Sequence, residues 1–342
     1  MDLNKKLYKY YNNKRILVIG GAGFIGSELS SQIANNCKHL TIIDNLVNGK
    51  LKNIKKLLSE DVKFKKIDIR NYDEINNAMK DIDIVFHLAC LGVRHSIHSP
   101  RENHDVNASA TLEILKIAKN NHIEKFIYIS TSEVYGNNVK IPISETHSTF
   151  PATVYGAAKL AAEAYCRAYW DTYRSNIVII RPFNSFGPNS HHEGDCGEVI
   201  PKFMLRSFVE KPLIIHGDGN QTRDFSYVSD TARGILLGGI NEKAIGKTIN
   251  IGFGAEVSIN QLAALIRDTV CNSNSKIVHS DPRPGDVKQL FSDNTCANNL
   301  LNYQPKISLK EGLFLLKKWY EKDSKNIKNL ISEEIEKNWL KT

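Results

Sequence analysis

The stretch GGAGFIG, which directly follows the apolar run 15–19, constrains the fold more strongly than any other part of the sequence. Three of its glycines, Gly20, Gly23 and Gly26, give the spacing G-x-x-G-x-x-G. A strand that passes through such a turn straight into a helix brings backbone segments so close together that side chains would block them. The spacing therefore predicts a strand–turn–helix unit whose helix N-terminus faces an anion such as a pyrophosphate.

Apolar runs alternate with amphipathic stretches through the first half of the chain. The predicted strands are 15–19, 39–44, 62–68, 83–89, 125–130 and 176–182, and the predicted helices are about 24–35, 73–79, 100–120 and 152–173. Apolar strands separated by helices indicate a parallel sheet that is covered on both faces. We therefore expect an α/β fold, a Rossmann-like doubly wound parallel sheet with a smaller α/β lobe for substrate.

The alternation stops after residue 182, where a polar, turn-rich segment begins. We expect the sheet domain to span residues 1–181, with a return segment near 221–250. The smaller lobe would then comprise residues 182–220 and 251–320. The remainder, 321–342, is predicted as a helical tail with a weak apolar stripe of Ile327, Ile331 and Ile335.

Composition and charge exclude several classes of protein. No apolar run is long enough to span a membrane, and the N-terminus lacks the apolar segment of a signal peptide. The six cysteines are scattered without a C-x-x-C pair, which is typical of a reduced, cytoplasmic protein. The net charge of +8 is spread over many separate lysines, so we expect no nucleic-acid partner.

An acidic residue at the end of the second predicted strand points to the cofactor. Asp44 is placed to accept hydrogen bonds from both hydroxyls of an adenosine ribose and to repel a 2′-phosphate, which favours NAD over NADP. Asn45 would lie beside it, and Asp68 could reach the adenine edge. The full set of expected NAD contacts is Gly20, Gly23, Phe24, Ile25, Gly26, Asp44, Asn45, Asp68, Ile69, Leu88, Ala89, Asn107, Tyr155 and Lys159.

A hydroxyl, a phenol and an amine occur in the order needed for proton transfer to or from an alcohol. Thr131 follows the fifth predicted strand, and Tyr155 and Lys159 lie four residues apart on one face of the next helix. An ammonium group beside a phenol favours phenolate, so Tyr155 could act as a general base near neutral pH. Thr131 could share the proton or hold the substrate oxygen.

At these residues the sequence resembles the extended short-chain dehydrogenase/reductase family, which includes sugar-nucleotide epimerases, dehydratases and decarboxylases. The likeness runs from about residue 15 to 316 and includes FHLA (86–89), RPFNSFGP (181–188), GDGNQTRDFSYVSD (217–230) and RPGDV (283–287). It implies bound NAD, a nucleoside-diphosphate sugar that is UDP-linked, and a homodimer formed through the helices 100–120 and 152–173. It also implies substrate contacts from Asn184, Arg223 and Arg283, with Asn107 near the nicotinamide.

The resemblance implies that Tyr155 takes a proton from a sugar hydroxyl while hydride passes from carbon 4 to NAD, and that the hydride later returns. Glu133 could move the proton at carbon 5 of the resulting ketone. Dehydratases and UDP-glucuronate decarboxylases carry Glu at this place, and TSEVYG is most similar to the decarboxylases. Ser132, which we also expect to contact the substrate, stands where dTDP-glucose dehydratases have Asp. The favoured function is therefore that of a UDP-glucuronate decarboxylase-like enzyme.

Other stretches favour different fates of the ketone. GVRHSIHSP (92–100) is more similar to glucuronate 4-epimerases, in which case Arg94 could pair with a hexuronate carboxylate. A UDP-sugar 4-epimerase, acting on glucuronate or a hexose, and a nucleotide-sugar 4,6-dehydratase are therefore the alternatives. A non-catalytic NAD-binding sensor is a remoter one, because such proteins usually lose the tyrosine or lysine. Asp44 argues against an NADP-linked reductase.

Two lesser features are interpreted as structural. The segment HHEGDC (191–196) has adjacent histidines in a loop, a poor arrangement for tetrahedral zinc, so we expect no metal and a loop that covers the substrate. Cys90 follows a buried strand and is expected to be a small core residue.

Overall fold

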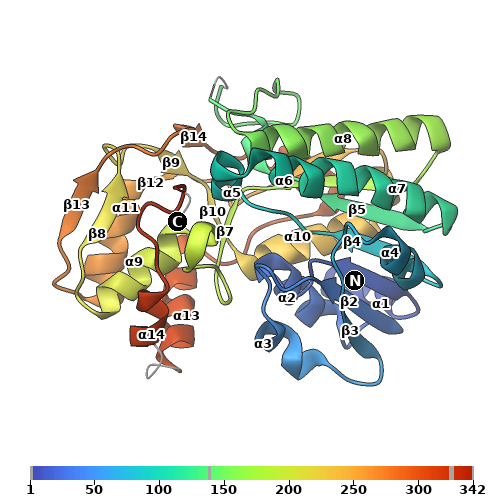
Figure 1. Ribbon diagram of the computed structural model, residues 1–342, viewed down its shortest axis with the longest axis horizontal. Helices are drawn as coiled ribbons and strands as arrows, with labels where there is room; N and C mark the ends of the chain where they lie inside the picture. Colours follow the sequence, from blue (N-terminus) through green and yellow to red (C-terminus); the bar gives the residue numbers. More distant parts are fainter. Residues whose placement is uncertain (1–2, 138–139, 323–326, 341–342) are drawn as a thin grey trace.

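The computed structural model describes residues 3–137, 140–322 and 327–340. Its centre is a seven-stranded, all-parallel sheet in the order β11-β6-β5-β4-β1-β2-β3 (Figure 1). The strands are β1 (Arg15–Ile19), β2 (His39–Asp44), β3 (Val62–Lys66), β4 (Ile84–His87), β5 (Lys125–Ile129), β6 (Ile177–Pro182) and β11 (Thr248–Ile251). The order of the strands reverses between β1 and β4, and ligands bind at such a switch point in doubly wound folds.

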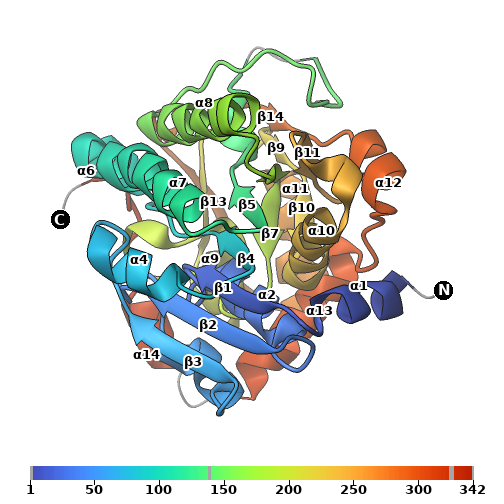
Figure 2. The same ribbon diagram turned by 90° about the vertical axis from the view of Figure 1, so that its right-hand side faces the viewer.

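Helices cover both faces of this sheet, as its continuously apolar strands require (Figure 2). Side chains of α1 (Leu3–Tyr11), α2 (Phe24–Ile33), α10 (Val228–Ile240) and α12 (Thr295–Leu301) share one buried core with the sheet. Side chains of α4 (Tyr72–Met79), α7 (Ala110–Asn120) and α8 (Val154–Tyr173) form a second core on the opposite face. The predicted α/β, Rossmann-like doubly wound sheet is confirmed.

The predicted helix 100–120 is divided. It consists of α6 (Pro100–His104), a π-helical turn (Asp105–Ser109) and α7. Single π-turns inside helices are frequent at functional sites. The short helix α5 (Val93–His98) comes directly before α6. α7 and α8 lie side by side on one face of the molecule (Figure 1). The pairing of two copies through these helices stays a prediction.

The smaller lobe has its own core. It contains short strands, in three groups: β8 (Leu213–His216) with β13 (Ile277–Ser280), β9 (Thr222–Arg223) between β12 (Val257–Ser258) and β14 (Gln289–Leu290), and β10 (Phe225–Tyr227) with β7 (Asn184–Phe186). Its helices are α9 (Val199–Phe208), α11 (Ile259–Ala264), a π-helical stretch (Leu265–Cys271), α13 (Leu309–Glu321) and α14 (Ile327–Ser332).

The structure departs from the expected domain boundaries in three places. β9 and β10, at the start of the expected return segment 221–250, belong to the small lobe. α12 belongs to the expected small lobe by sequence, but it packs against β11 and α10 of the sheet domain. The expected separate tail is part of the small lobe, since Ile327 and Ile331 are buried in its core and α14 packs on α9. Among the described residues, no helix is both long and apolar enough to cross a membrane.

Candidate active site

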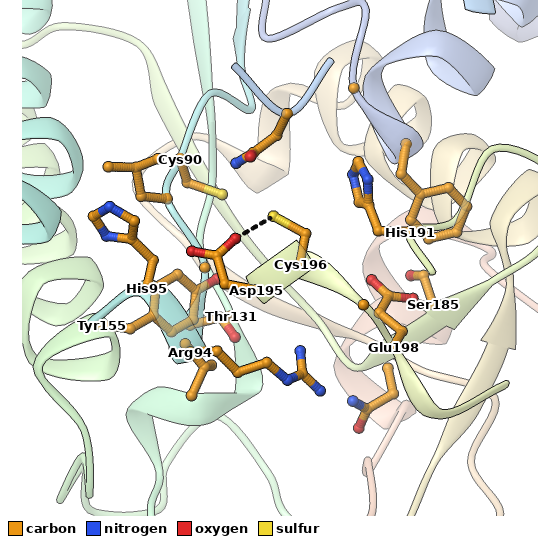
Figure 3. A pocket seen from close by; sticks show the side chains of 18 of the residues that line it. Cys90, Arg94, His95, Thr131, Tyr155, Ser185, His191, Asp195, Cys196 and Glu198 are labelled. Carbon is orange, nitrogen blue, oxygen red and sulfur yellow. Dashed lines mark hydrogen bonds between the residues drawn. The ribbon is translucent and has the colours of Figure 1, made fainter. Parts of the chain in front are cut away.

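A cleft between the sheet domain and the small lobe brings the predicted site residues together. Its volume is about 560 Å³, within the range of small-molecule sites. We call residues 187–198, which cross it between β7 and α9, the cover loop. Figure 3 shows Tyr155 beside Thr131, with cover-loop side chains opposite. The predicted residues that line the cleft are Gly20, Gly23, Phe24, Ile25, Gly26, Asp44, Asn45, Asp68, Ile69, Leu88, Ala89, Arg94, Thr131, Ser132, Glu133, Tyr155, Lys159, Asn184, Arg223 and Arg283.

The glycine loop leaves no room for side chains. Gly20 has φ +82°, and a Cβ on it would lie 2.5 Å from the backbone nitrogen of Ala89. A Cβ on Gly26 would lie 2.2 Å from the carbonyl oxygen of Gly20. α2 begins at Phe24, and its N-cap Gly23 has no side chain to occupy the first amide groups. Those donors and the helix dipole therefore fit a pyrophosphate, and the loop fits a dinucleotide cofactor.

Asp44 is held at the end of β2 by backbone amides. One of its carboxylate oxygens accepts a hydrogen bond from the amide of Ala22 (3.1 Å), and the other accepts one from the amide of Leu46 (2.8 Å). Burial raises the pKa of Asp44, and these donors oppose the shift. Each carboxylate oxygen has a further lone pair, so this fixed carboxylate can still receive two ribose hydroxyls.

The carboxylate of Asp68 accepts hydrogen bonds from two neighbouring side chains. Two of these bonds come from the guanidinium of Arg70, both 2.9 Å, and one comes from the amide of Asn45 (3.0 Å). The guanidinium holds the pKa of Asp68 well below its usual range. The sequence analysis missed Arg70, which also lines the cleft. Together Asn45, Asp68 and Arg70 form a rigid polar edge next to Asp44.

Asn107 is the predicted site residue that does not line the cleft. It is 1% exposed and lies behind the cleft wall, where its amide oxygen accepts a hydrogen bond from the Leu91 amide (3.0 Å) and its amide nitrogen donates to the Leu91 carbonyl (2.9 Å). In this structure it fixes the segment that follows β4 instead of facing the cofactor space.

The phenol of Tyr155 and the hydroxyl of Thr131 meet just beyond the C-terminal end of β5. Thr131 comes two residues after β5 ends, and Tyr155 lies in the first turn of α8, whose N-cap Thr153 accepts a hydrogen bond from the amide of Gly156 (3.2 Å). Burial raises the pKa of Tyr155 well above its usual value, and a hydrogen bond to Thr131 opposes the shift. Cys90 also contributes to raising it, and this thiol is exposed to the cleft rather than a core residue as expected.

Lys159, which lines the cleft with Tyr155, is also anchored to the strand that precedes Thr131. Its ammonium donates a hydrogen bond to the Ile129 carbonyl (2.5 Å) and lies 4.4 Å from the ring centre of Tyr128. Burial lowers the pKa of this 2% exposed side chain. Burial therefore disfavours the charged form of both groups, raising the pKa of Tyr155 and lowering that of Lys159.

A buried ion pair joins α8, the helix that carries Tyr155, to strand β6. Glu163 on α8 is 0% exposed. Its two carboxylate oxygens accept hydrogen bonds from Nε and Nη2 of Arg181 in β6, at 2.8 and 2.6 Å. Ser130, next to Thr131, donates a hydrogen bond to the same carboxylate (2.5 Å). This network ties the end of β5 to α8 and so sets the position of Thr131 relative to Tyr155.

The opposite wall of the cleft is cationic. Arg223 and Arg283 both donate to one oxygen of Asp286, at 2.6 and 2.5 Å. Arg94 makes no ion pair among the described residues, and burial, with nearby Arg283, lowers its pKa to about 10. Lys202 lines the same wall, where burial lowers its pKa to about 8. Two guanidinium groups on a single carboxylate leave positive charge for an anionic ligand.

Two acidic side chains lie among these cations. Burial raises the pKa of Glu133, and Arg223 and Arg283 oppose that shift. The Glu133 carboxyl group makes no hydrogen bond or ion pair within the described part of the chain, so it is available to a ligand. Burial raises the pKa of Glu198, in the cover loop, to about 7. Glu198 and Asp286 were missed by the sequence analysis, although they stand in or beside turn-rich stretches that it singled out.

Ion pairs attach the cover loop to the sheet domain at two places. Glu193 forms an ion pair with Lys50 of the sheet domain (2.7 Å), and Asp195 forms one with His98 of α5 (3.2 Å). His191 lies 3.2 Å from Glu193. The histidines of this loop are thus paired with carboxylates, and no group of three or more potential metal ligands occurs among the residues described.

Comparisons with known proteins agree with this geometry. Residues 16–252 match the model of the NAD dependent epimerase/dehydratase family. A putative UDP-glucose 4-epimerase of Methanocaldococcus jannaschii is 34% identical over 91% of this chain and 99% of its own length. The structure of the epimerase Mth375 from Methanothermobacter thermautotrophicus has a TM-score of 0.91 and 33% identity, covering 96% of this chain and 98% of that one.

A further solved structure bears on the cofactor. It is the UDP-glucuronic acid 4-epimerase of Bacillus cereus in complex with UDP-glucuronic acid and NAD, with a TM-score of 0.85 and 33% identity over 90% of this chain and 99% of that one. The predicted family and the predicted cofactor are both confirmed. The chain belongs to the NAD-dependent epimerase/dehydratase family, and NAD is its cofactor.

Proposed function

We propose that this enzyme oxidises carbon 4 of a UDP-linked hexuronate and that the resulting 4-keto sugar loses its carboxylate, as in a UDP-glucuronate decarboxylase. The substrate class is supported by Arg94, a partly buried cation on the cleft wall without an ion-pair partner among the described residues. A charged side chain in such a place is costly unless a ligand of opposite charge meets it. A hexuronate carboxylate supplies that charge.

The diphosphate would lie against the two arginines that share Asp286. Their planar guanidinium groups suit bidentate binding of phosphate oxygens. The side-chain oxygen of Asn184, also in the cleft, is buried and has no hydrogen-bond partner among the described residues. A ribose or sugar hydroxyl could donate to it. These groups support a nucleoside-diphosphate sugar lying across the cleft from the small lobe toward Tyr155.

In the proposed reaction, Tyr155 removes the proton of the carbon 4 hydroxyl and Thr131 holds the same oxygen. The glycine loop and Asp44 would hold NAD, which when bound would accept the hydride and later return it. The ketone weakens the bond to the carboxylate at carbon 5, because the electrons released with carbon dioxide can move into the carbonyl. The carbon must then receive a proton.

This choice of reaction rests on a single observation, the position of the Glu133 carboxyl group in the cleft. The group faces the same cleft as Tyr155, and burial favours its protonated form. A proton donor at carbon 5 is needed after carbon dioxide leaves, whereas a simple 4-epimerase has no step there for an acid. The position and raised pKa of Glu133 suit that proton transfer.

A UDP-glucuronate 4-epimerase is the second candidate. It is favoured by the similarity to the UDP-glucuronic acid 4-epimerase of Bacillus cereus. Arg94 favours it too, since a cation paired with the carboxylate stabilises that group against loss as carbon dioxide. In this case hydride returns to the other face of the intact ketone. A 4,6-dehydratase has weaker support, because Ser132 offers no carboxylate next to Glu133.

The product mass distinguishes these fates. The purified enzyme is incubated with UDP-glucuronate, UDP-glucose and UDP-N-acetylglucosamine in separate reactions, and the products are identified by mass spectrometry. Loss of carbon dioxide from UDP-glucuronate supports decarboxylation, and an isomer of unchanged mass supports epimerisation. Turnover of a neutral sugar alone would contradict the hexuronate assignment.

A further inference from the structure

The last residues of the described chain return to the cleft. After α14 the described residues run past α9 (Figure 1). Arg206 of α9 donates to both carboxylate oxygens of Glu334, at 2.8 and 2.9 Å, and Lys202 donates to the Ile335 carbonyl (2.7 Å). The segment is therefore fixed to the helix that carries part of the cationic wall.

Asn338 joins the same segment to the cover loop. Its side chain is buried, and its amide nitrogen lies within hydrogen-bond distance of the carbonyl oxygens of Gly194 (3.2 Å), Asp195 (3.4 Å) and Gly197 (3.1 Å). The backbone amide of Gly194 also donates to the Glu333 carbonyl (3.4 Å). These hydrogen bonds join the cover loop and residues 333–339 into one continuous wall of the cleft.

Trp339 places an aromatic ring on this wall. It is 6% exposed, and its ring lies perpendicular to that of His216 with the ring centres 4.8 Å apart. Both rings line the cleft. Lys202 and Arg283 line the same cleft, so this aromatic pair adjoins the cationic wall. Burial lowers the pKa of His216, and the two cations add to that shift. His216 Nδ1 is buried without a hydrogen-bond partner among the described residues.

We propose that residues 333–339 complete the nucleotide end of the cleft and that Trp339, supported by His216, is the surface on which the nucleobase of the substrate stacks. The inference rests on the proposed function, which puts the diphosphate on Arg223 and Arg283. One ribose then separates the diphosphate from the base, so an aromatic ring next to the arginines lies within its reach. Every base has a π-face that stacks on an aromatic side chain.

The test compares two ligands on the full-length, NAD-loaded protein. Binding of UDP and of inorganic pyrophosphate is measured by isothermal titration calorimetry for the wild type, Trp339→Ala, Trp339→Phe and the control Leu340→Ala, whose side chain is 56% exposed. Loss of base stacking should weaken UDP binding to Trp339→Ala about 5- to 150-fold. Pyrophosphate binding should change less than about 2-fold, Trp339→Phe should retain most of the affinity, and Leu340→Ala should resemble the wild type.

Other outcomes overturn the inference in distinguishable ways. Unchanged or tighter UDP binding to Trp339→Ala shows that the ring does not hold the base, and the proposed function then stands without it. Equal weakening for UDP and pyrophosphate shows that the segment only maintains the cationic wall. A wild-type protein that binds neither ligand refutes the proposed function, and the stacking inference falls with it.

Discussion

The ammonium of Lys159 donates its hydrogen bond to the carbonyl of Ile129, 2.5 Å away, at the end of β5. The lysine therefore links α8 to the strand that precedes Thr131, in addition to lying one helical turn from Tyr155. Because this ammonium is buried, its charge acts on the phenol with little screening by solvent.

We predict that the rate of the first oxidation rises with pH above 7. Tyr155 acts as a base only when deprotonated, and burial raises its pKa, so the active fraction grows as pH increases. Lys159→Met removes the neighbouring positive charge, which should move the rise to higher pH and lower the rate at pH 7 about 100-fold. The absorbance of reduced nicotinamide after substrate addition gives the oxidation rate at each pH for the wild type and for Lys159→Met. An unshifted pH profile in Lys159→Met would argue against this role.

Replacement of Glu133 should separate the steps of the reaction. Glu133→Gln keeps the shape of the side chain but cannot deliver a proton at carbon 5, so we expect reduced nicotinamide to form while product falls at least about 100-fold. Glu113→Gln on the surface of α7 is the matched control. If Glu133→Gln releases product at the wild-type rate, the acid at carbon 5 is another group or is not needed.

Arg94 should determine preference for a charged sugar. Arg94→Met removes a charge-assisted contact of about 1.5–3 kcal/mol, which corresponds to a rise of roughly 10- to 150-fold in KM for UDP-glucuronate. KM for a neutral UDP-hexose should not rise. Arg101→Met, whose side chain is 88% exposed, serves as the control. Equal losses for charged and neutral sugars would place Arg94 on the diphosphate instead.

Asp44 should govern the choice of cofactor. Asp44→Ser removes the carboxylate that repels a 2′-phosphate, so NAD affinity should fall about 10-fold while NADP affinity increases. Titration of the cofactor-free protein with each dinucleotide, followed by calorimetry, gives both constants. NADP binding that stays unchanged in the variant would show that other residues exclude the phosphate.

The pair of Glu163 and Arg181 should make stability depend on acid pH. Arg181 lowers the pKa of Glu163 below its ordinary value of 4.5, so the pair stabilises the fold fully above that value, and this stability is lost as pH falls toward the lower, folded-state pKa. Glu163→Gln leaves Arg181 buried without its partner and should lower the free energy of unfolding by roughly 3–5 kcal/mol. Urea denaturation of the wild type and of Glu163→Gln, at pH 7 and at pH 4, measures the loss of stability in acid and the cost of the substitution. A double variant, Glu163→Gln with Arg181→Met, should be less destabilised than Glu163→Gln alone.

The sequence by itself determined the elements whose signals are local. The glycine spacing at Gly20, Gly23 and Gly26 placed a strand-to-helix turn between β1 and α2, and both elements begin where the pattern indicated. Helical periodicity put Tyr155 and Lys159 on one face of α8. Such signals depend on residues a few positions apart, so burial elsewhere in the chain does not change them.

The tertiary structure alone decided what depends on contacts between distant segments. Desolvation set the direction of the pKa of Tyr155, and the Ile129 carbonyl became the partner of Lys159. The ion pair between Glu163 and Arg181 and the place of Trp339 in the cleft wall also depend on how the folded chain brings distant segments together. No periodicity or motif encodes such pairings, because burial and charge at each site are sums over residues that only folding brings together.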